Sequence, residues 1–99
     1  MTIRIGNAPC SWGIAYPTGN HYSWSQYLDE VAEAGYRGTE LGPLGFLPKD
    51  ADLLRDELGR RNLTLIGATH VHTFGDAASA PVLMATLREL STLLKTLGA

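Results

Sequence analysis

The sequence predicts an α/β fold in which parallel strands carry outer helices. Short β-forming segments alternate with amphipathic helical segments in the order β-α-β-α-β-α. Each βα unit takes roughly 30 residues, and almost no linker separates the second helix from the third strand, as is typical of βαβ units. Because parallel neighbours need a crossover connection, this order predicts a parallel sheet with right-handed crossovers.

The first unit is predicted as a strand over residues 3–8 followed by a loop over residues 9–22, which begins with a proline that cannot continue a ladder. Ser23 then opens a helix with Gln26 as its capping-box partner, and Gly35 ends it. The apolar positions of this helix recur at spacings of three and four: Trp24, Tyr27, Leu28, Val31 and Ala32. We therefore expect that face to pack in the core.

The second unit begins with a brief strand over residues 37–41, bounded by a Gly-Pro pair. Asp50 can cap the following helix, and Asn62 is its expected stop. The acidic residues of this helix come early, whereas Arg60 and Arg61 fall in the expected last turn, where they match the helix dipole. Its apolar residues are Leu53, Leu54 and Leu58.

The third unit begins with a strand over residues 63–69, continues through a loop over 70–80 and ends with a helix that has Pro81 in its first turn. That helix carries an apolar series: Leu83, Met84, Leu87, Leu90, Leu94 and Leu97. The series is only about two heptads long, so core packing explains it better than a coiled coil.

Two architectures use this element order. A doubly wound sheet would place a glycine-rich phosphate turn after the first strand, but the residues at 6–9, Gly-Asn-Ala-Pro, lack the G-x-G-x-x-G spacing. A (β/α)₈ TIM barrel fits better, and three units are about three-eighths of its roughly 250 residues. We therefore expect residues 1–99 to form a partial barrel domain.

Composition excludes several classes of protein. The 99 residues carry 8 Lys+Arg against 10 Asp+Glu, a formal charge of −2, with 44% hydrophobic residues. The scattered basic residues form no stripe for nucleic acid, and the apolar content argues against disorder. No signal peptide or run of about 18 apolar residues occurs, so we expect neither export nor membrane insertion. Cys10 is the single cysteine and cannot form an internal disulfide, which favours the cytoplasm.

Two strings give the chain a resemblance to a known family: APCSWG at residues 8–13 and YLDEVAEAGYRGTELGPLGFLP at residues 27–48. The chain resembles the N-terminal part of the sugar isomerase/epimerase superfamily, the xylose-isomerase-like TIM barrels, and within it the inosose-dehydratase-like branch of inositol catabolism. The likeness covers residue 3 to about residue 75. It is shared by dehydratases, isomerases and epimerases.

The resemblance implies a cytoplasmic enzyme that acts on a polyol, keto-sugar or inosose. In such relatives a divalent metal (Mn²⁺, Co²⁺ or Mg²⁺) polarises a carbonyl while a carboxylate abstracts a proton from carbon. The metal ligands, typically two glutamates, an aspartate and a histidine, come mostly from later strands of the barrel. We therefore expect this chain to hold no complete metal site and to be inactive by itself.

Active sites of barrels gather at the carboxyl ends of the strands. Residues at these positions give the expected substrate-binding set: Asn7, Cys10, Trp12, Glu40, His70 and His72. Glu40 is also the catalytic candidate, for proton transfer; the alternative is that its carboxylate only caps the amides of residues 43–45. His70 and His72 would point to one side of an extended segment, and we favour substrate contact over metal binding or a plain surface position. We expect Cys10 to be a buried or pocket-lining thiol rather than a nucleophile.

Two hypotheses of different class follow. In the first, the chain is the truncated N-terminal part of an inosose-dehydratase-like enzyme. In the second, it is a non-catalytic βα fragment that associates with itself or with a chain supplying the remaining strands, because an open parallel edge and an uncovered apolar face favour association. In either case we expect marginal stability for the isolated chain.

Overall fold

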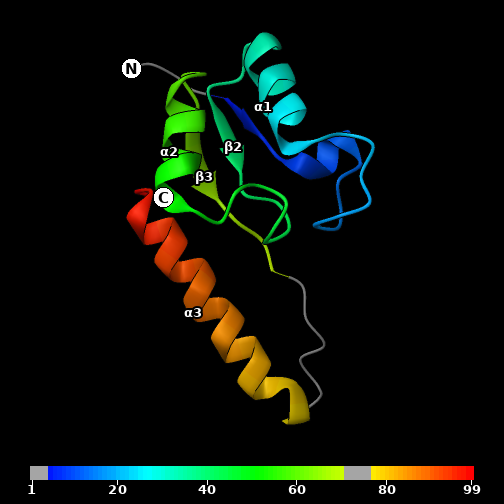
Figure 1. The fold of residues 1–99 in the computed structure, drawn as a ribbon, viewed down its shortest axis with the longest axis vertical. Helices are drawn as coiled ribbons and strands as arrows, with labels where there is room; N and C mark the ends of the chain where they lie inside the picture. Colours follow the sequence, from blue (N-terminus) through cyan, green and yellow to red (C-terminus); the bar gives the residue numbers. More distant parts are fainter. Residues whose placement is uncertain (1–4, 71–76) are drawn as a thin grey trace.

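The computed structural model describes residues 5–70 and 77–99 and has the predicted alternation of strands and helices (Figure 1). The elements are β1 (Gly6–Asn7), the 3-10 helix η1 (Pro9–Trp12), α1 (Trp24–Glu33), β2 (Gly38–Glu40), α2 (Ala51–Gly59), β3 (Thr64–Gly67), the 3-10 helix η2 (Ala77–Ser79) and α3 (Ala80–Thr96). The strands form one parallel sheet in the order β1-β2-β3. The predicted α/β class with a parallel sheet is confirmed.

The strands lie where they were predicted but are shorter. In the described part of the first segment, β1 ends after Asn7 because the next residues turn into η1, in which the Ser11 amide donates to the Ala8 carbonyl at 3.0 Å. The expectation of a plain loop over residues 9–22 was therefore wrong at its start. Pro9 holds its φ near the value a helix needs and has no amide proton to lose, so it suits the first turn of η1.

The predicted starts of α1 and α2 are confirmed by their capping hydrogen bonds. The Ser23 hydroxyl accepts from the Gln26 amide at 3.1 Å, and the Asp50 carboxylate accepts from two amides of the first turn of α2. Gly35, at φ 92°, follows α1 as predicted, but α2 ends at Gly59, three residues before the predicted stop at Asn62, which has φ 56°. Both conformations lie in the left-handed region, which glycine and asparagine adopt more readily than other residues.

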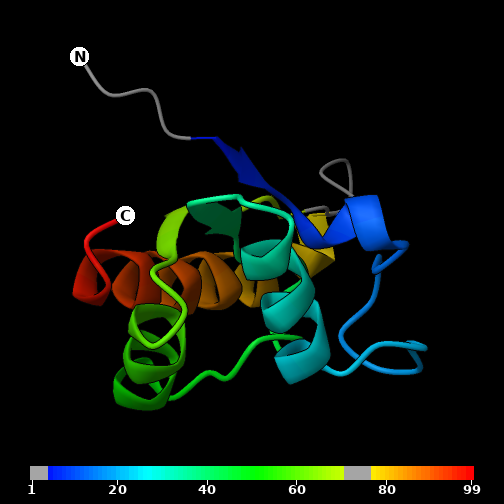
Figure 2. The ribbon, with the colours of Figure 1, turned by 90° about the horizontal axis from the view of Figure 1, so that it is seen from above.

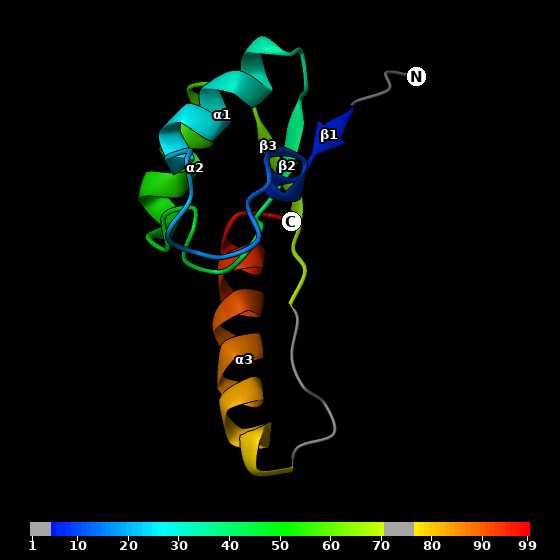
Figure 3. The ribbon, with the colours of Figure 1, turned by 90° about the vertical axis from the view of Figure 1, so that its right-hand side faces the viewer.

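The core lies between the sheet and helices α1 and α2, which cover the same face of it (Figures 2 and 3). Its most deeply buried apolar members are Ile14, Tyr27, Leu28, Val31, Leu41, Leu47 and Leu54. No described helix covers the opposite face, where Ile66 is 54% exposed. There the Ile66 side chain lies over Gly6 and Gly38: a Cβ added to either glycine would come within 3 Å of it.

Helix α3 packs along only part of its length. Leu90 and Leu93 are buried and the backbone carbonyl of Thr96 accepts a hydrogen bond from Arg55 at 2.8 Å, whereas Met84 and Leu87 are exposed. Its amino-terminal half runs beyond the sheet (Figure 1). The expected core role of the whole leucine series was therefore wrong for Met84 and Leu87, because no other described element reaches that face.

Arg61 joins α1 to α2. Its side chain is only 5% exposed and donates to the Asp29 carboxylate at 2.7 Å, to the Glu57 carboxylate at 2.7 Å and to the Ser25 hydroxyl at 3.3 Å. The prediction that Arg60 and Arg61 lie in the last helical turn as complements to the dipole was wrong, since α2 ends at Gly59. Within the described residues, no helix is long and apolar enough to cross a membrane.

Candidate functional site

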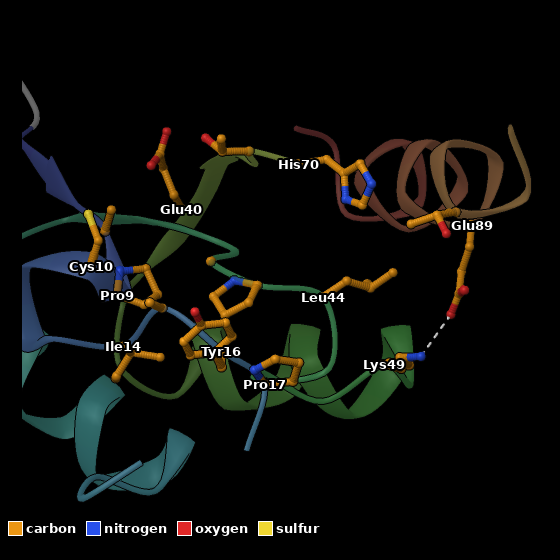
Figure 4. Close-up of a pocket in the computed structure, with 16 residues that line it drawn as sticks. Pro9, Cys10, Ile14, Tyr16, Pro17, Glu40, Leu44, Lys49, His70 and Glu89 are labelled. Atoms are coloured by element: carbon orange, nitrogen blue, oxygen red, sulfur yellow. Dashed lines mark ion pairs between the residues drawn. The ribbon is translucent and has the colours of Figure 1, made fainter. Parts of the chain in front are cut away.

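A pocket of about 760 Å³ opens at the carboxyl ends of the strands (Figure 4). Four parts of the chain line it: residues 8–10 and 14–17 after β1; Glu40, residues 42–44 and Lys49 at and after β2; Thr69 and His70 after β3; and Thr86 and Glu89 on α3. The parallel sheet explains the convergence, because parallel strands bring their carboxyl ends to one edge. Apolar side chains such as Ile14 and Leu44 make up much of the wall.

Three of the predicted site residues meet in this pocket: Cys10, Glu40 and His70. They come from the three successive strand ends, as the sequence predicted. Cys10 is exposed, while Glu40 and His70 are half-buried. Of the two positions expected for Cys10, the structure shows the pocket-lining one, and the buried one was wrong. His72 lies outside the residues that the structure describes.

Glu40 sits at an irregularity in the sheet. Thr39 pairs with Leu65, but Glu40 pairs with Gly67, so one residue of β3 is skipped between them. The ladder resumes beyond it, where the Leu41 amide donates to the Gly67 carbonyl at 2.9 Å. Such irregularities re-aim a side chain and are frequent next to active sites.

The carboxylate of Glu40 accepts no hydrogen bond from any described residue. The Glu40 carboxylate therefore does not cap the amides of residues 43–45, which was the alternative role, and all three residues are described. The Glu40 carboxylate is free to accept hydrogen bonds from a molecule in the pocket. Figure 4 shows it on the same side of the pocket as Cys10, with His70 across from them.

Two further predicted residues do not line the pocket. The Asn7 side-chain oxygen accepts from the Ala8 amide at 2.8 Å and from the Ser11 hydroxyl at 2.6 Å, so it stabilises the turn into η1. The Trp12 ring packs edge-on against Tyr27 with ring centroids 5.1 Å apart. Both residues thus shape the loop that forms one wall of the pocket.

Lys49 and Glu89 form an ion pair of 3.3 Å at the end of the pocket away from Cys10 (Figure 4). The pair joins the segment before α2 to α3. Sequence reasoning missed it, because neither residue belongs to a motif and 40 positions separate them.

A divalent metal is implied by the resemblance, and the described residues do not fit one. Among residues 5–70 and 77–99, no three His, Cys, Asp or Glu side chains are grouped so that they could hold an ion. Cys10, Glu40 and His70 line one pocket without forming such a group. Cys10, Glu40 and His70 can supply hydrogen bonds to a molecule in the pocket.

Tyr27 lies directly beneath the site. Its hydroxyl is 2.7 Å from the Thr39 hydroxyl, and neither residue is exposed. Burial raises the pKa of Tyr27 to about 12, although the hydrogen bond with Thr39 acts in the opposite direction. The Tyr27 hydroxyl therefore stays protonated at neutral pH.

The comparisons with known proteins identify one group of relatives. The chain is 38% identical to the inosose dehydratase of Mesomycoplasma hyopneumoniae strain J, over 67% of this chain and 22% of that protein. It is 37% identical to the inosose dehydratase of Lacticaseibacillus casei, over 69% of this chain and 23% of that protein. It is 33% identical to the inosose dehydratase of Geobacillus kaustophilus, over 97% of this chain and 31% of that protein.

No family model matches the chain, and no solved structure matches it. The chain spans about a quarter to a third of the length of the curated relatives it matches. The match is thus modest in identity and confined to a part of each relative. The chain resembles the N-terminal part of the inosose dehydratases.

Proposed function

We propose that this chain is the N-terminal part of an inosose-dehydratase-like enzyme of the cytoplasm, which moves a proton on a polyol, keto-sugar or inosose. The observation that carries the proposal is the position of Glu40. It lies inside the string that carries the resemblance, at the end of β2, and lines a pocket with Cys10 and His70. Its carboxylate accepts no hydrogen bond from the described residues.

We propose that residues 1–99 are three βα units of a TIM barrel. The strand order β1-β2-β3 follows the chain, and α1 and α2 cover one face only, which is the arrangement of a singly wound barrel wall. A doubly wound sheet would carry helices on both faces. The exposed face with Ile66 then corresponds to the barrel interior.

In this proposal Glu40 accepts a hydrogen bond from a substrate hydroxyl or takes a proton from it, while Cys10 and His70 contact neighbouring hydroxyls. Asn7 and Trp12 support the loop that carries Cys10. His72 is proposed as a further substrate contact. The divalent metal of such enzymes would need ligands from strands beyond β3.

The test is a titration of the ¹⁵N-labelled chain with inosose, followed by NMR. We expect saturable shifts in the amides around Cys10, Glu40 and His70. Glu40→Gln should weaken binding at least fivefold, whereas Glu33→Gln, an exposed glutamate on α1, should bind as the parent chain does. Equal affinity for the parent chain and Glu40→Gln would contradict the role of Glu40.

The alternative is a non-catalytic fragment that associates through its open side. It is favoured by the outer edge of β3, which pairs with no described strand, and by the exposure of Ile66, Val82 and Met84. Light scattering after size-exclusion chromatography tests it. A defined oligomer that Ile66→Ser dissociates, combined with no inosose binding, would favour this alternative over the enzyme fragment.

A further inference from the structure

The end of β2 is held by a chain of hydroxyl groups that starts in α1. The Thr39 hydroxyl donates to the Glu40 carbonyl at 2.9 Å and lies 2.7 Å from the Tyr27 hydroxyl. A threonine hydroxyl has a single proton, and here the Glu40 carbonyl receives it. The Tyr27 hydroxyl must therefore be the donor to Thr39, which gives a directed chain from Tyr27 through Thr39 to the backbone of Glu40.

These linked hydroxyl groups reach the backbone at the point where the β2–β3 ladder is irregular. The register changes between Thr39 and Glu40, so regular ladder pairing does not by itself fix the direction of Glu40. A hydrogen bond to the Glu40 carbonyl constrains the peptide plane that follows its Cα. The linked hydroxyl groups thus help to fix the direction of Glu40, which a regular ladder would fix elsewhere in the sheet.

Tyr27 is itself held rigidly. It is fully buried, and its ring packs edge-on against Trp12 at 5.1 Å and against Phe46 at 5.9 Å. Trp12 belongs to the segment after β1 and Phe46 to the segment after β2, and both segments continue into pocket walls. One side chain therefore ties the two walls to the carbonyl of Glu40.

We infer that Tyr27 is a positioning residue, which acts through Thr39 to fix Glu40 in the direction that lines the pocket. The inference rests on the proposed function only for what Glu40 does there. Tyr27 does not itself line the pocket, so the inference gives it no part in the chemistry. Its protonated state, which the raised pKa of about 12 maintains, keeps it a donor across the neutral range.

Amide hydrogen exchange in the 99-residue chain tests this inference, since two amides link β2 to β3 at opposite ends. The Leu41 amide donates to Gly67 beside the irregularity, and the Thr64 amide donates to Arg37 at the other end. A general loss of stability accelerates hydrogen exchange at both amides equally. A loss of local positioning accelerates Leu41 alone, so the ratio of the two exchange rates separates the two effects.

We expect Tyr27→Phe and Thr39→Val to raise the Leu41:Thr64 ratio roughly fivefold, the loss expected for one net hydrogen bond. Thr39→Ser, which keeps the hydroxyl, should restore the parent ratio. The matched control is Tyr36→Phe, since Tyr36 is half-buried and its hydroxyl makes no hydrogen bond to the described residues. The χ1 angle of Glu40, read from three-bond couplings, should be single in the parent chain and averaged in the two hydroxyl deletions.

An unchanged ratio and an unaveraged Glu40 χ1 in both deletions would overturn the inference, and Tyr27 would then be a core residue only. If Tyr27→Phe does not fold, the comparison of Thr39→Val with Thr39→Ser decides in the same way. Glu40→Gln should leave the exchange ratio unchanged while it weakens inosose binding. A failure of the proposed function is therefore distinguishable from a failure of the positioning role.

Discussion

Replacement of Arg61 by methionine tests whether the α1–α2 contact depends on a buried guanidinium. Methionine keeps an apolar stem of similar length, so the change removes mainly the charged head. In the folded chain that head donates to Asp29, Glu57 and Ser25 and is almost fully buried. It also donates to the backbone carbonyl of Glu57 at 2.8 Å.

The expected loss follows from what the partners do once the head is gone. Removal of one member of a fully buried ion pair costs about 3–5 kcal/mol, because the other charge remains buried. Here the Asp29 side chain is 55% exposed and can regain water, so the higher values do not apply. We expect Arg61→Met to lower the free energy of unfolding by about 2 kcal/mol.

Arg60 provides the matched control, because it is the next residue and donates to the same Glu57 carboxylate at 2.6 Å. Its side chain is 63% exposed, so Arg60→Met should cost less than about 0.5 kcal/mol. Urea unfolding followed by far-UV circular dichroism measures both variants. Equal losses for Arg60→Met and Arg61→Met would refute the reasoning, since burial would then not distinguish the two arginines.

Three further predictions concern backbone conformation and pH. Gly42→Ala should lower the free energy of unfolding in urea by about 2–3 kcal/mol, because a Cβ at φ 71° would lie 2.5 Å from the ring of Pro9. The control is Gly13→Ala, at φ 77° in open space, which should lower it by only about 1 kcal/mol. Hydrogen bonds from Arg60 and Arg61 lower the pKa of Glu57 below its ordinary 4.5. The folded chain should therefore lose stability as pH falls from 4.5 through the folded pKa. Glu57→Gln should flatten that part of the curve of urea midpoint against pH. Because the folded pKa of Tyr27 is about 12 against an ordinary 10.0, stability should fall as pH rises through that window, and tyrosinate absorbance at 295 nm should show a late step that Tyr27→Phe removes.

The parts of the fold that sequence reasoning predicted are those set by neighbours along the chain. Ser23 and Asp50 cap helices because their side chains reach amides two or three residues away. Gly35 follows the last turn of α1 because it tolerates positive φ. Such features need no knowledge of the tertiary structure. The two caps and Gly35 were predicted at the correct residue, whereas α2 ends at Gly59, three residues before the predicted stop at Asn62.

The parts that were missed depend on residues far apart in the sequence. Arg61 was expected to complement a helix dipole, but its position is set by Asp29, 32 positions earlier. The irregularity at Glu40 depends on how β2 pairs with β3, and hydrophobic patterning carries no information on a skipped residue. The candidate site was therefore predicted in its strand-end residues, whereas the Lys49–Glu89 pair and the role of Tyr27 required the structure.

The one-sided sheet connects the exposed apolar residues with the candidate site. Residues on one face of β2 and β3 pack against α1 and α2, as Thr39 and Leu65 do, and are buried. The opposite face carries Ile66, which lies over two glycines too small to keep it from solvent. In the proposed barrel this face is the interior, where large and small side chains from neighbouring strands fill a common layer. Closure of the barrel would then bury Ile66 and leave Glu40, beyond it at the carboxyl end of β2, at the mouth where substrate enters.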